Sequence, residues 1–201
     1  MYIPKEYQWS AEGEIAEFIS ENPFAIIVNQ IDGRIWATHT PIIQTKKKNI
    51  LFAHIAKANI QWKSFKEDHE VLLMFNGPQS YISSSWYDHE SVPTWNYCAV
   101  HIYGVVNIVE DKHMYQYMRD FMEHFESTEP HGQKLEDLSE DYVNRELKNI
   151  VGFEIEIKEV QAVEKMSQGK NAQNRKRIVQ ALHQKDELAS DAVVKRIKSQ
   201  E

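Results

Sequence analysis

The chain has 201 residues, of which 42% are hydrophobic and 11% aromatic, a composition that predicts a folded globular protein and excludes a disordered chain. Its formal net charge of −7 argues against the whole molecule being a nucleic-acid binder. The single cysteine, Cys98, excludes an internal disulfide framework and a cysteine-built zinc site, and its apolar neighbours predict a packed structural residue.

Charge and hydropathy also bear on location and organisation. No apolar run approaches the roughly 18 residues of a membrane span, and the start MYIPKEYQWS lacks the basic and apolar blocks of a signal peptide. We therefore expect a cytoplasmic protein with no membrane partner. Residues 169–201 hold eight basic and four acidic residues, so this segment carries +4 and the remainder −11. This contrast predicts a main domain over residues 1–168 and a basic helical tail over 169–201.

The first elements are a helix and a hairpin. A helix is predicted after Ser10, which is a favoured N-cap residue. An apolar strand follows over 24–30, and Asp32-Gly33 is a hairpin turn signal. The partner strand is expected over 34–44, with Pro41 marking a strand end or a bulge because proline cannot donate to the ladder.

The stretch from Asn49 to Trp62 is predicted to join a strand directly to a helix. Its short apolar run is followed by His54, Lys57 and Asn59, at the point where the helix would expose its first free amides. Unpaired amides and the positive end of a helix dipole favour an anion. The stretch therefore predicts an anion site to which Lys57 adds a full positive charge.

The second half of the chain predicts three more strands and further helices. The strands are expected over 70–82, 97–109 and 151–163, and the helices over 111–125 and 142–148 and as two short helices in the tail. A further expectation is a close backbone approach at Gly104. About six strands with antiparallel turn signals and peripheral helices predict a mainly β protein built on a small closed or half-closed barrel. Glycine-rich nucleotide loops of Walker or Rossmann type are absent from the sequence, which disfavours those folds.

Catalytic and metal signatures are weak. The nine histidines include no HExxH or His-x-His pair, and carboxylates at ligand spacing are missing around His39 and His54. We therefore predict neither a metal site nor a catalytic residue. Polar groups remain at residues 38–41 on one strand and at residues 54–59 on the next. They allow two interpretations: they bind a ligand, or they hydrogen-bond to one another at the rim of a barrel.

Five short motifs, in the expected order along nearly the whole chain, decide between these interpretations. They are Met1-Tyr2-Ile3-Pro4, Ala37-Thr38-His39-Thr40-Pro41, Phe52-Ala53-His54-Ile55-Ala56-Lys57-Ala58-Asn59, Val92-Pro93-Thr94-Trp95-Asn96-Tyr97 and Lys165-Met166-Ser167-Gln168. Through them the sequence resembles the PaiB family of FMN-binding negative transcriptional regulators, which belongs to the FMN-binding split-barrel superfamily.

The resemblance implies a Greek-key split β-barrel with a C-terminal helical tail, and a homodimer that binds FMN between its subunits. It implies the following cofactor-binding residues: Thr38, His39, Thr40, His54, Lys57, Asn59, Asn96, Tyr97, Lys165 and Ser167. The phosphate is expected at Lys57 and Asn59, and the flavin ring near the aromatic loop.

The function that the resemblance implies is repression of sporulation and protease-production genes. DNA contacts would then come from Arg175, Lys176 and Arg177 in the basic tail, although a solvated helix face explains the same residues. Two alternatives stay open: an FMN-dependent oxidoreductase, in which the flavin carries the hydride chemistry, and a haem-binding split-barrel protein.

Overall fold

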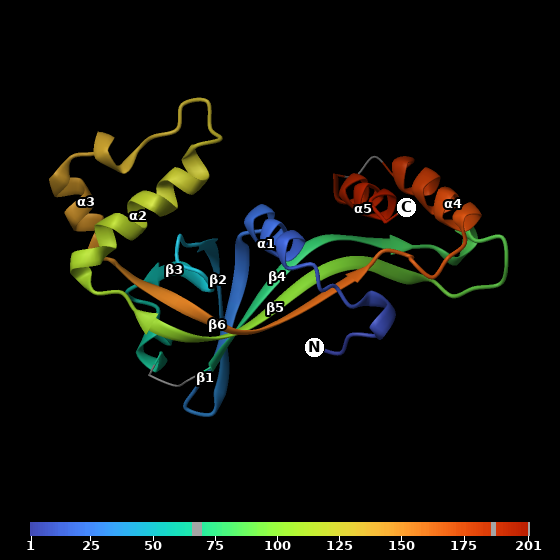
Figure 1. Ribbon diagram of the computed structural model, residues 1–201. Coiled ribbons are helices and arrows are strands. Elements are labelled where there is room, and N and C mark those ends of the chain that lie inside the picture. The colour runs from blue at the N-terminus through green and yellow to red at the C-terminus, as the bar shows by residue number, and fades with distance from the viewer. Residues whose placement is uncertain (66–69, 186–187, 201) are drawn as a thin grey trace. The chain divides into compact units, whose positions relative to one another are not determined.

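The structure is a computed structural model that describes residues 1–65, 70–185 and 188–200 (Figure 1). Its strands are β1 (Phe24–Ile31), β2 (Arg34–Gln44), β3 (Ile50–Ala56), β4 (Glu70–Ile82), β5 (Thr94–Ile108) and β6 (Ile150–Lys165). Its α-helices are α1 (Glu12–Glu21), α2 (Asp111–Glu126), α3 (Glu140–Leu147), α4 (Ala172–His183) and α5 (Leu188–Lys198). Short 3-10 helices are η1 (Lys5–Tyr7), η2 (Ile60–Ser64), η3 (Ser84–Trp86) and η4 (Leu135–Asp137). No helix among these described residues is both long and apolar enough to cross a membrane.

The strands close into one barrel in the order β1-β2-β3-β6-β5-β4, which confirms the predicted fold class. The β1–β2 pair is an antiparallel hairpin whose ladder runs from Phe24 opposite Pro41 to Ile31 opposite Arg34. Its two turn residues, Asp32 and Gly33, have φ of 48° and 81°. Positive φ at both positions is the geometry that a two-residue hairpin requires, so the turn prediction is confirmed.

Pro41 lies where β2 changes partner. It is opposite Phe24 in the last pair with β1, and the next residue, Ile42, is opposite Ala53 in the first pair with β3. The strand continues to Gln44, which confirms the predicted bounds, and Pro41 marks a change of partner and not a strand end. A proline is tolerated at this position because the ladder hydrogen bonds pass from one neighbour to the other.

The chain divides into two compact units, which we describe separately. The barrel unit comprises residues 19–74 and 102–160. Its interior is filled by large apolar side chains that are fully buried, among them Phe52 and Phe153. At Gly104 an added Cβ would lie 2.8 Å from the carbonyl oxygen of Glu156, so the expected close backbone approach is confirmed.

The helical unit comprises residues 1–18, 75–101 and 161–201. Here α4 and α5 pack together and bury the side chains of Ile178, Leu182, Val193 and Ile197. Cys98 on β5 is 2% exposed, and burial, with the nearby Glu164 carboxylate, raises the pKa of its thiol to about 12. The expected structural role of Cys98 is therefore confirmed, whereas a domain boundary at residue 168 stays a prediction.

Candidate functional site

The stretch that was expected to start a helix is a turn in the barrel unit. β3 ends at Ala56, and the Asn59 amide donates to the Ala56 carbonyl at 2.9 Å to close the turn. The helix that follows is η2, with five residues of 3-10 geometry. The predicted helix start beside His54 and Lys57 is therefore wrong. Because a 3-10 helix of this length aligns few peptide dipoles, attraction for an anion at this turn depends on the Lys57 ammonium.

Local hydrogen bonds explain why the helix starts late. Asn59 is extended and its Oδ1 accepts from the Gln61 amide at 3.0 Å, so Asn59 is the N-cap of η2. The Trp62 indole donates to the Lys57 carbonyl at 2.9 Å. The Lys57 amide donates to the Asn149 carbonyl at 2.7 Å. These three bonds hold residues 57–59 outside the helix.

Two hydrogen bonds connect the predicted site residues of β2 to the next strand and turn. Asn59 Nδ2 donates to Thr38 Oγ1 at 2.8 Å, and Thr40 Oγ1 donates to the His54 carbonyl at 2.8 Å. Thr40 is buried, with 3% exposure, and its proton is already used. The structure therefore brings Thr38, Thr40, His54 and Asn59 together, and part of this polar cluster satisfies itself.

Three polar residues that were not predicted from the sequence extend this cluster from the turn to β1. Gln61 is fully buried and its Nε2 donates to Asn29 Oδ1 at 3.0 Å and to the Ile27 carbonyl at 3.1 Å. Asn29 in turn donates to Ser64 Oγ at 2.7 Å. A signal was present, because Asn29 shares its strand face with the buried Ala25 and Ile27. The network fastens η2 to β1 and fixes the turn that carries Lys57.

Several groups near the turn keep hydrogen-bonding capacity for a ligand. Lys57 is exposed, and within residues 1–65, 70–185 and 188–200 its ammonium has no hydrogen-bond or ion-pair partner. Thr38 Oγ1 accepts from Asn59 and retains its own proton. His39 follows Thr38 on β2, so its side chain lies on the other face of the strand, where it is exposed and stacks on Phe24 with ring centroids 5.9 Å apart.

His54 carries an unsatisfied atom. Its Nδ1 is buried without a hydrogen-bond partner among the described residues, and its ring meets the edge of Phe121 at 4.8 Å between centroids. Burial lowers the pKa of the imidazole. The Lys57 ammonium and the Thr38 hydroxyl, neither of which donates to a described residue, form a donor set that fits a phosphate or another polar ligand bound by a single cation.

The other four predicted residues lie in the helical unit, where two of them bond to each other. Asn96 is fully buried, and its Nδ2 donates to Ser167 Oγ at 3.0 Å. Ser167 is a non-glycine residue with φ of 62°, a conformation that costs energy and is held here by tertiary contacts. Lys165 and Tyr97 are half-buried, and Lys165 Nζ donates to Thr94 Oγ1 at 2.6 Å.

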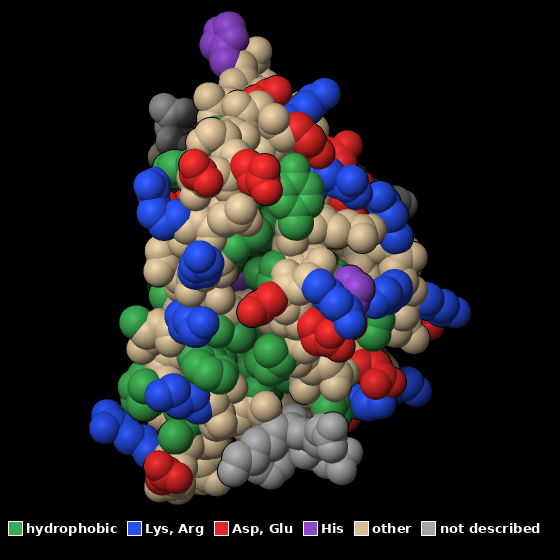
Figure 2. Space-filling model, turned by 90° about the vertical axis from the view of Figure 1, so that its left-hand side faces the viewer, with side chains coloured by type: hydrophobic (Ala, Val, Ile, Leu, Met, Phe, Trp, Pro, Cys, Tyr) green, Lys and Arg blue, Asp and Glu red, His purple; other side chains and the backbone are tan. Residues whose placement is uncertain are grey.

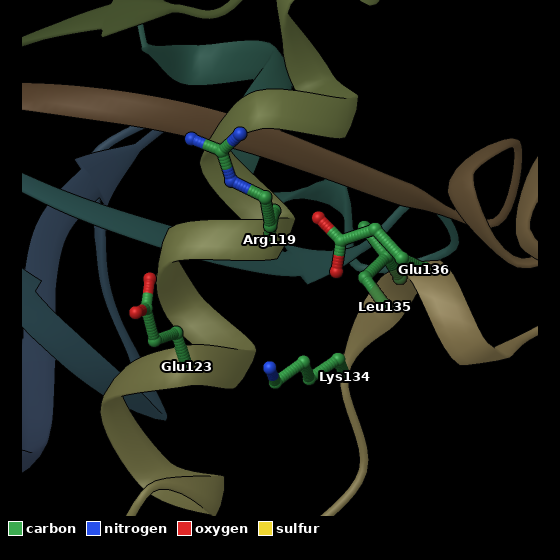
Figure 3. Close-up of a pocket in the computed structure, with 5 residues that line it drawn as sticks. All are labelled: Arg119, Glu123, Lys134, Leu135 and Glu136. Carbon is green, nitrogen blue, oxygen red and sulfur yellow. The ribbon is translucent and has the colours of Figure 1, made fainter.

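A pocket elsewhere in the barrel unit contains none of the predicted residues. It has a volume of about 500 Å³ and is lined by Arg119 and Glu123 of α2 and by residues 134–136. In Figure 3 the side chains of Lys134 and Glu136 point toward α2. Arg119 is already hydrogen-bonded to Asp120 at 2.9 Å. Because the other charged side chains that line the pocket are both basic and acidic, the pocket offers no concentrated charge for a ligand.

The predicted DNA-contacting residues lie in the first turns of α4. Lys176 and Arg177 are exposed and Arg175 is half-buried. The neighbouring Asn174 is buried and donates to Asp88 Oδ1 at 2.8 Å, which fixes the start of α4 within the helical unit.

The closed barrel of six strands places the chain in the split-barrel fold class, and comparisons with known proteins give its family. Residues 1–159 match the family model described as "Putative FMN-binding domain". The chain is 36% identical over 207 residues to "Protease synthase and sporulation protein PAI 2" of Bacillus subtilis (strain 168), covering 98% of this chain and 100% of that protein. It is 26% identical over 238 residues to an uncharacterised protein of Aspergillus fumigatus, covering 92% of this chain and 91% of that protein.

Solved structures share the fold at low identity. A flavocytochrome from Azotobacter vinelandii has a TM-score of 0.65 at 12% identity, with 82% of this chain and 72% of that chain covered. An FAD and heme binding protein from Mycobacterium smegmatis has a TM-score of 0.62 at 12% identity, with 84% and 78% covered. The chain belongs to the PaiB family of FMN-binding-domain proteins. The family match supports FMN as a cofactor.

Proposed function

We propose that this protein is an FMN-binding negative transcriptional regulator that acts on sporulation and protease-production genes. The observation that carries the proposal is the full-length similarity to the Bacillus subtilis protein, whose name refers to protease synthesis and sporulation. The free donors at the Lys57 turn support the FMN part of the proposal.

In this proposal the turn that carries Lys57 binds the FMN phosphate. Lys57 supplies the charge, Thr38 supplies a hydroxyl donor, and Asn59 holds the turn against β2 through its 2.8 Å bond to Thr38. His39, on the other face of β2, is proposed as a separate ligand-binding residue. Next to the turn, the hydrogen bond from the Thr40 hydroxyl to the His54 carbonyl holds β2 against β3. When bound, FMN would supply redox-sensitive flavin chemistry to the regulator. Asn96, Tyr97, Lys165 and Ser167 are proposed as further ligand-binding residues of the helical unit.

Titration of the purified protein with FMN tests this part of the proposal. We expect quenching of flavin fluorescence with saturable, one-site behaviour at micromolar protein. Riboflavin, which lacks the phosphate, should bind more weakly by at least about tenfold, because it loses the charge-assisted contact. Unquenched fluorescence at every concentration would contradict the proposal.

A homodimer is supported by an apolar outer face on the barrel unit. Phe24 and Ile35 on the β1–β2 hairpin are 65% and 74% exposed. Ile26 and Val28 of β1 lie opposite Met74 and Leu72 of β4, and all four are partly exposed on the same face. An exposed sheet face of this kind is typical of a protein interface. We propose that a second copy of the chain covers it.

Light scattering coupled to size-exclusion chromatography tests the dimer. The unmodified chain should elute with twice the 23.6 kDa chain mass, and Ile35→Asp should elute as a monomer. Tyr142→Asp, at a residue that is 45% exposed elsewhere in the barrel unit, is the matched control and should stay dimeric. A monomeric unmodified chain would refute the proposed interface.

Direct DNA binding is proposed for the start of α4. On the face of the molecule drawn in Figure 2, basic and acidic side chains are interspersed, a pattern that gives no extended positive field there. Lys176 and Arg177 are exposed and adjacent on α4, which favours this helix for contacts to phosphates.

The DNA test uses point substitutions, because the buried residues of α4 and α5 belong to the core of the helical unit. Lys176→Gln/Arg177→Gln should weaken retardation of promoter DNA and reduce its salt dependence. Lys195→Gln, an exposed position on α5, is the control. Retardation that is equal in all variants would refute the assignment to α4.

A further inference from the structure

A second pocket of the barrel unit lies between α2 and the turn that joins β2 to β3. Its volume is about 370 Å³, and it is lined by residues 45–47 of that turn, residues 108–110 between β5 and α2, four residues of α2 and Glu154 of β6. Pockets that bind small molecules have volumes of roughly 300 to 1,000 Å³. Among the described residues that line this Glu154 pocket, none is proposed to bind FMN.

Three side chains that bond to one another form one wall of the Glu154 pocket. Lys47 Nζ donates to Glu154 Oε1 at 2.8 Å and to the Tyr117 hydroxyl at 3.0 Å. The Tyr117 hydroxyl in turn donates to Glu154 Oε1. The Glu154 side chain is 19% exposed, and the Tyr117 ring stacks on Phe52 with centroids 4.7 Å apart. This wall is therefore held in place by packing and by its own hydrogen bonds.

The three groups keep fixed charges near neutral pH. Hydrogen bonds to Glu154 and Tyr117 raise the pKa of Lys47. Burial opposes ionisation of Glu154, but the hydrogen bonds from Lys47 and Tyr117 outweigh it and lower the pKa of the carboxyl. Burial, followed by the bond to Glu154, raises the pKa of Tyr117. The wall therefore presents an ammonium and a carboxylate side by side.

Both charged groups of this wall have hydrogen-bonding capacity left for a ligand. An ammonium has three donors, and Lys47 uses two of them. Glu154 Oε2 makes no hydrogen bond to the part of the chain that the structure describes. At the rim, Lys46 Nζ lies 3.8 Å from Asp120 Oδ2, which is longer than a hydrogen bond, and the Lys46 side chain is 86% exposed. Lys46 can therefore turn toward a ligand.

The charges in the lining disfavour a ligand of a single sign. An anion would face the carboxylates of Glu110, Asp120 and Glu154. A cation would face the ammonium groups of Lys46 and Lys47. Like charges that come close together repel, which discriminates against both kinds of ligand. A zwitterion meets an opposite charge for each of its own.

The positions of the lining groups also define how the ligand is built. Because Lys47 and Glu154 are bonded at 2.8 Å, a zwitterion that pairs with both must carry its two charges close together. The ammonium and carboxylate on the α-carbon of an amino acid have this arrangement. Ile108, which is 43% exposed, and the half-buried Val109 add an apolar side to the pocket. An aliphatic side chain on the ligand would cover them.

We propose that the Glu154 pocket binds a free α-amino acid with an aliphatic side chain. The ligand ammonium donates to Glu154 Oε2, and the ligand carboxylate accepts from Lys47 and Lys46. The aliphatic side chain covers Ile108 and Val109. This proposal does not rest on FMN binding at the Lys57 turn, because the two sites share no residue.

Isothermal titration calorimetry of the unmodified chain tests the ligand class with four probes. L-Leucine is the expected ligand. 6-Aminohexanoate has the same atoms as leucine but carries its charges at opposite ends, 4-methylpentanoate lacks the ammonium, and 3-methylbutylamine lacks the carboxylate. We expect saturable one-site binding of leucine and binding that is weaker by about tenfold or more for each of the other three, because each loses a charge-assisted contact.

Three substitutions test the location of the site. Glu154→Gln should weaken leucine binding by about tenfold. Lys46→Gln should weaken it by about threefold, because Lys46 is exposed. Lys48→Gln is the matched control, since Lys48 is exposed on the same turn but lies outside the pocket lining, and leucine binding should be unchanged. Circular dichroism and the Tm of each variant establish that the fold is intact.

The outcomes separate this proposal from the FMN proposal. Absence of leucine binding, or binding of any other probe as tight as that of leucine, overturns the amino-acid site. An equal loss in Lys48→Gln and Lys46→Gln overturns its assignment to the Glu154 pocket. FMN titration of the unmodified chain is scored separately, so leucine binding without FMN binding refutes only the FMN proposal.

Discussion

Asn59 Nδ2 donates a 2.8 Å hydrogen bond to Thr38 Oγ1 while Asn59 Oδ1 accepts from the amide of Gln61 at 3.0 Å. One side chain therefore both caps η2 and ties the turn to β2. This double role couples the stability of the turn to the position of Lys57, two residues earlier in the chain.

Substitution at Asn59 should separate folding from ligand binding. Asn59→Ala removes the cap and the bond to Thr38, and we expect a loss of about 1 to 2 kcal/mol in the free energy of unfolding. Asn59→Asp keeps the capping oxygen, and its second carboxylate oxygen can accept the Thr38 hydroxyl proton in place of the lost Nδ2 donation, so its stability should stay close to that of the unmodified chain. Its added negative charge should nevertheless weaken FMN binding. Urea denaturation and FMN fluorescence measure the two effects, and a parallel loss of both in Asn59→Asp would contradict this separation.

Lys57→Ala should weaken FMN binding without changing stability. The variant loses one charge-assisted contact to phosphate, worth about 1.5 to 3 kcal/mol, or roughly 10- to 150-fold in Kd. Riboflavin affinity should be unaffected, since riboflavin has no phosphate. Lys63→Ala is the matched control, because Lys63 is exposed on η2 and its ammonium lies 5.9 Å from the Trp62 ring. An equal effect in both variants would point to general electrostatics instead of a phosphate site.

The strands could be predicted from sequence because their patterns are local. The two-residue periodicity of β6, with Phe153 and Ile155 fully buried, and the Asp32-Gly33 turn give the hairpins and the barrel class directly. Resemblance then supplied the family. Both predictions are confirmed by the strand order and by the family match.

The start of η2 could not be predicted in the same way. Histidine, lysine and asparagine after a strand are compatible with a helix or with a turn, and the choice was made by contacts to residues distant in sequence. The Lys57 amide bonds to Asn149, and Asn59 bonds to Thr38. The pairing of Asn96 with Ser167 likewise joins positions 71 residues apart. Such contacts leave no periodic signal in the chain.

Removal of Arg196 should destabilise the helical unit strongly. Its guanidinium lies 3.1 Å from Glu164, and the two side chains are 20% and 15% exposed. Arg196→Met leaves the carboxylate without its cation, and the expected cost is about 3 kcal/mol. Glu164→Met/Arg196→Met should cost less than Arg196→Met alone, because no uncompensated charge remains. Urea denaturation followed by tryptophan fluorescence measures both variants.

The exposed pair of Lys158 and Glu156 is the control for this experiment. Its atoms are 2.6 Å apart, but both side chains are 46% exposed. Lys158→Met should change the free energy of unfolding by less than about 1 kcal/mol. A double variant that is less stable than Arg196→Met would show that the Arg196–Glu164 pair does not stabilise through charge compensation.

His54 should make the protein less stable in mild acid. Burial lowers the pKa of its imidazole in the folded state, so between the folded value and the unfolded value of about 6.5 the unfolded chain binds more protons. The contribution of His54 to the free energy of unfolding is therefore fully present above the pKa of the unfolded chain. It decreases as the pH falls below that value and stops decreasing once the pH is below the pKa of the folded protein. His54→Phe, which keeps an aromatic ring against Phe121, should reduce the difference in unfolding free energy between pH 7.5 and pH 5.5. The remaining difference should fall further in His54→Phe/His101→Phe, because burial also lowers the pKa of His101. An unchanged pH dependence in His54→Phe would mean that His54 is protonated in the folded protein without cost.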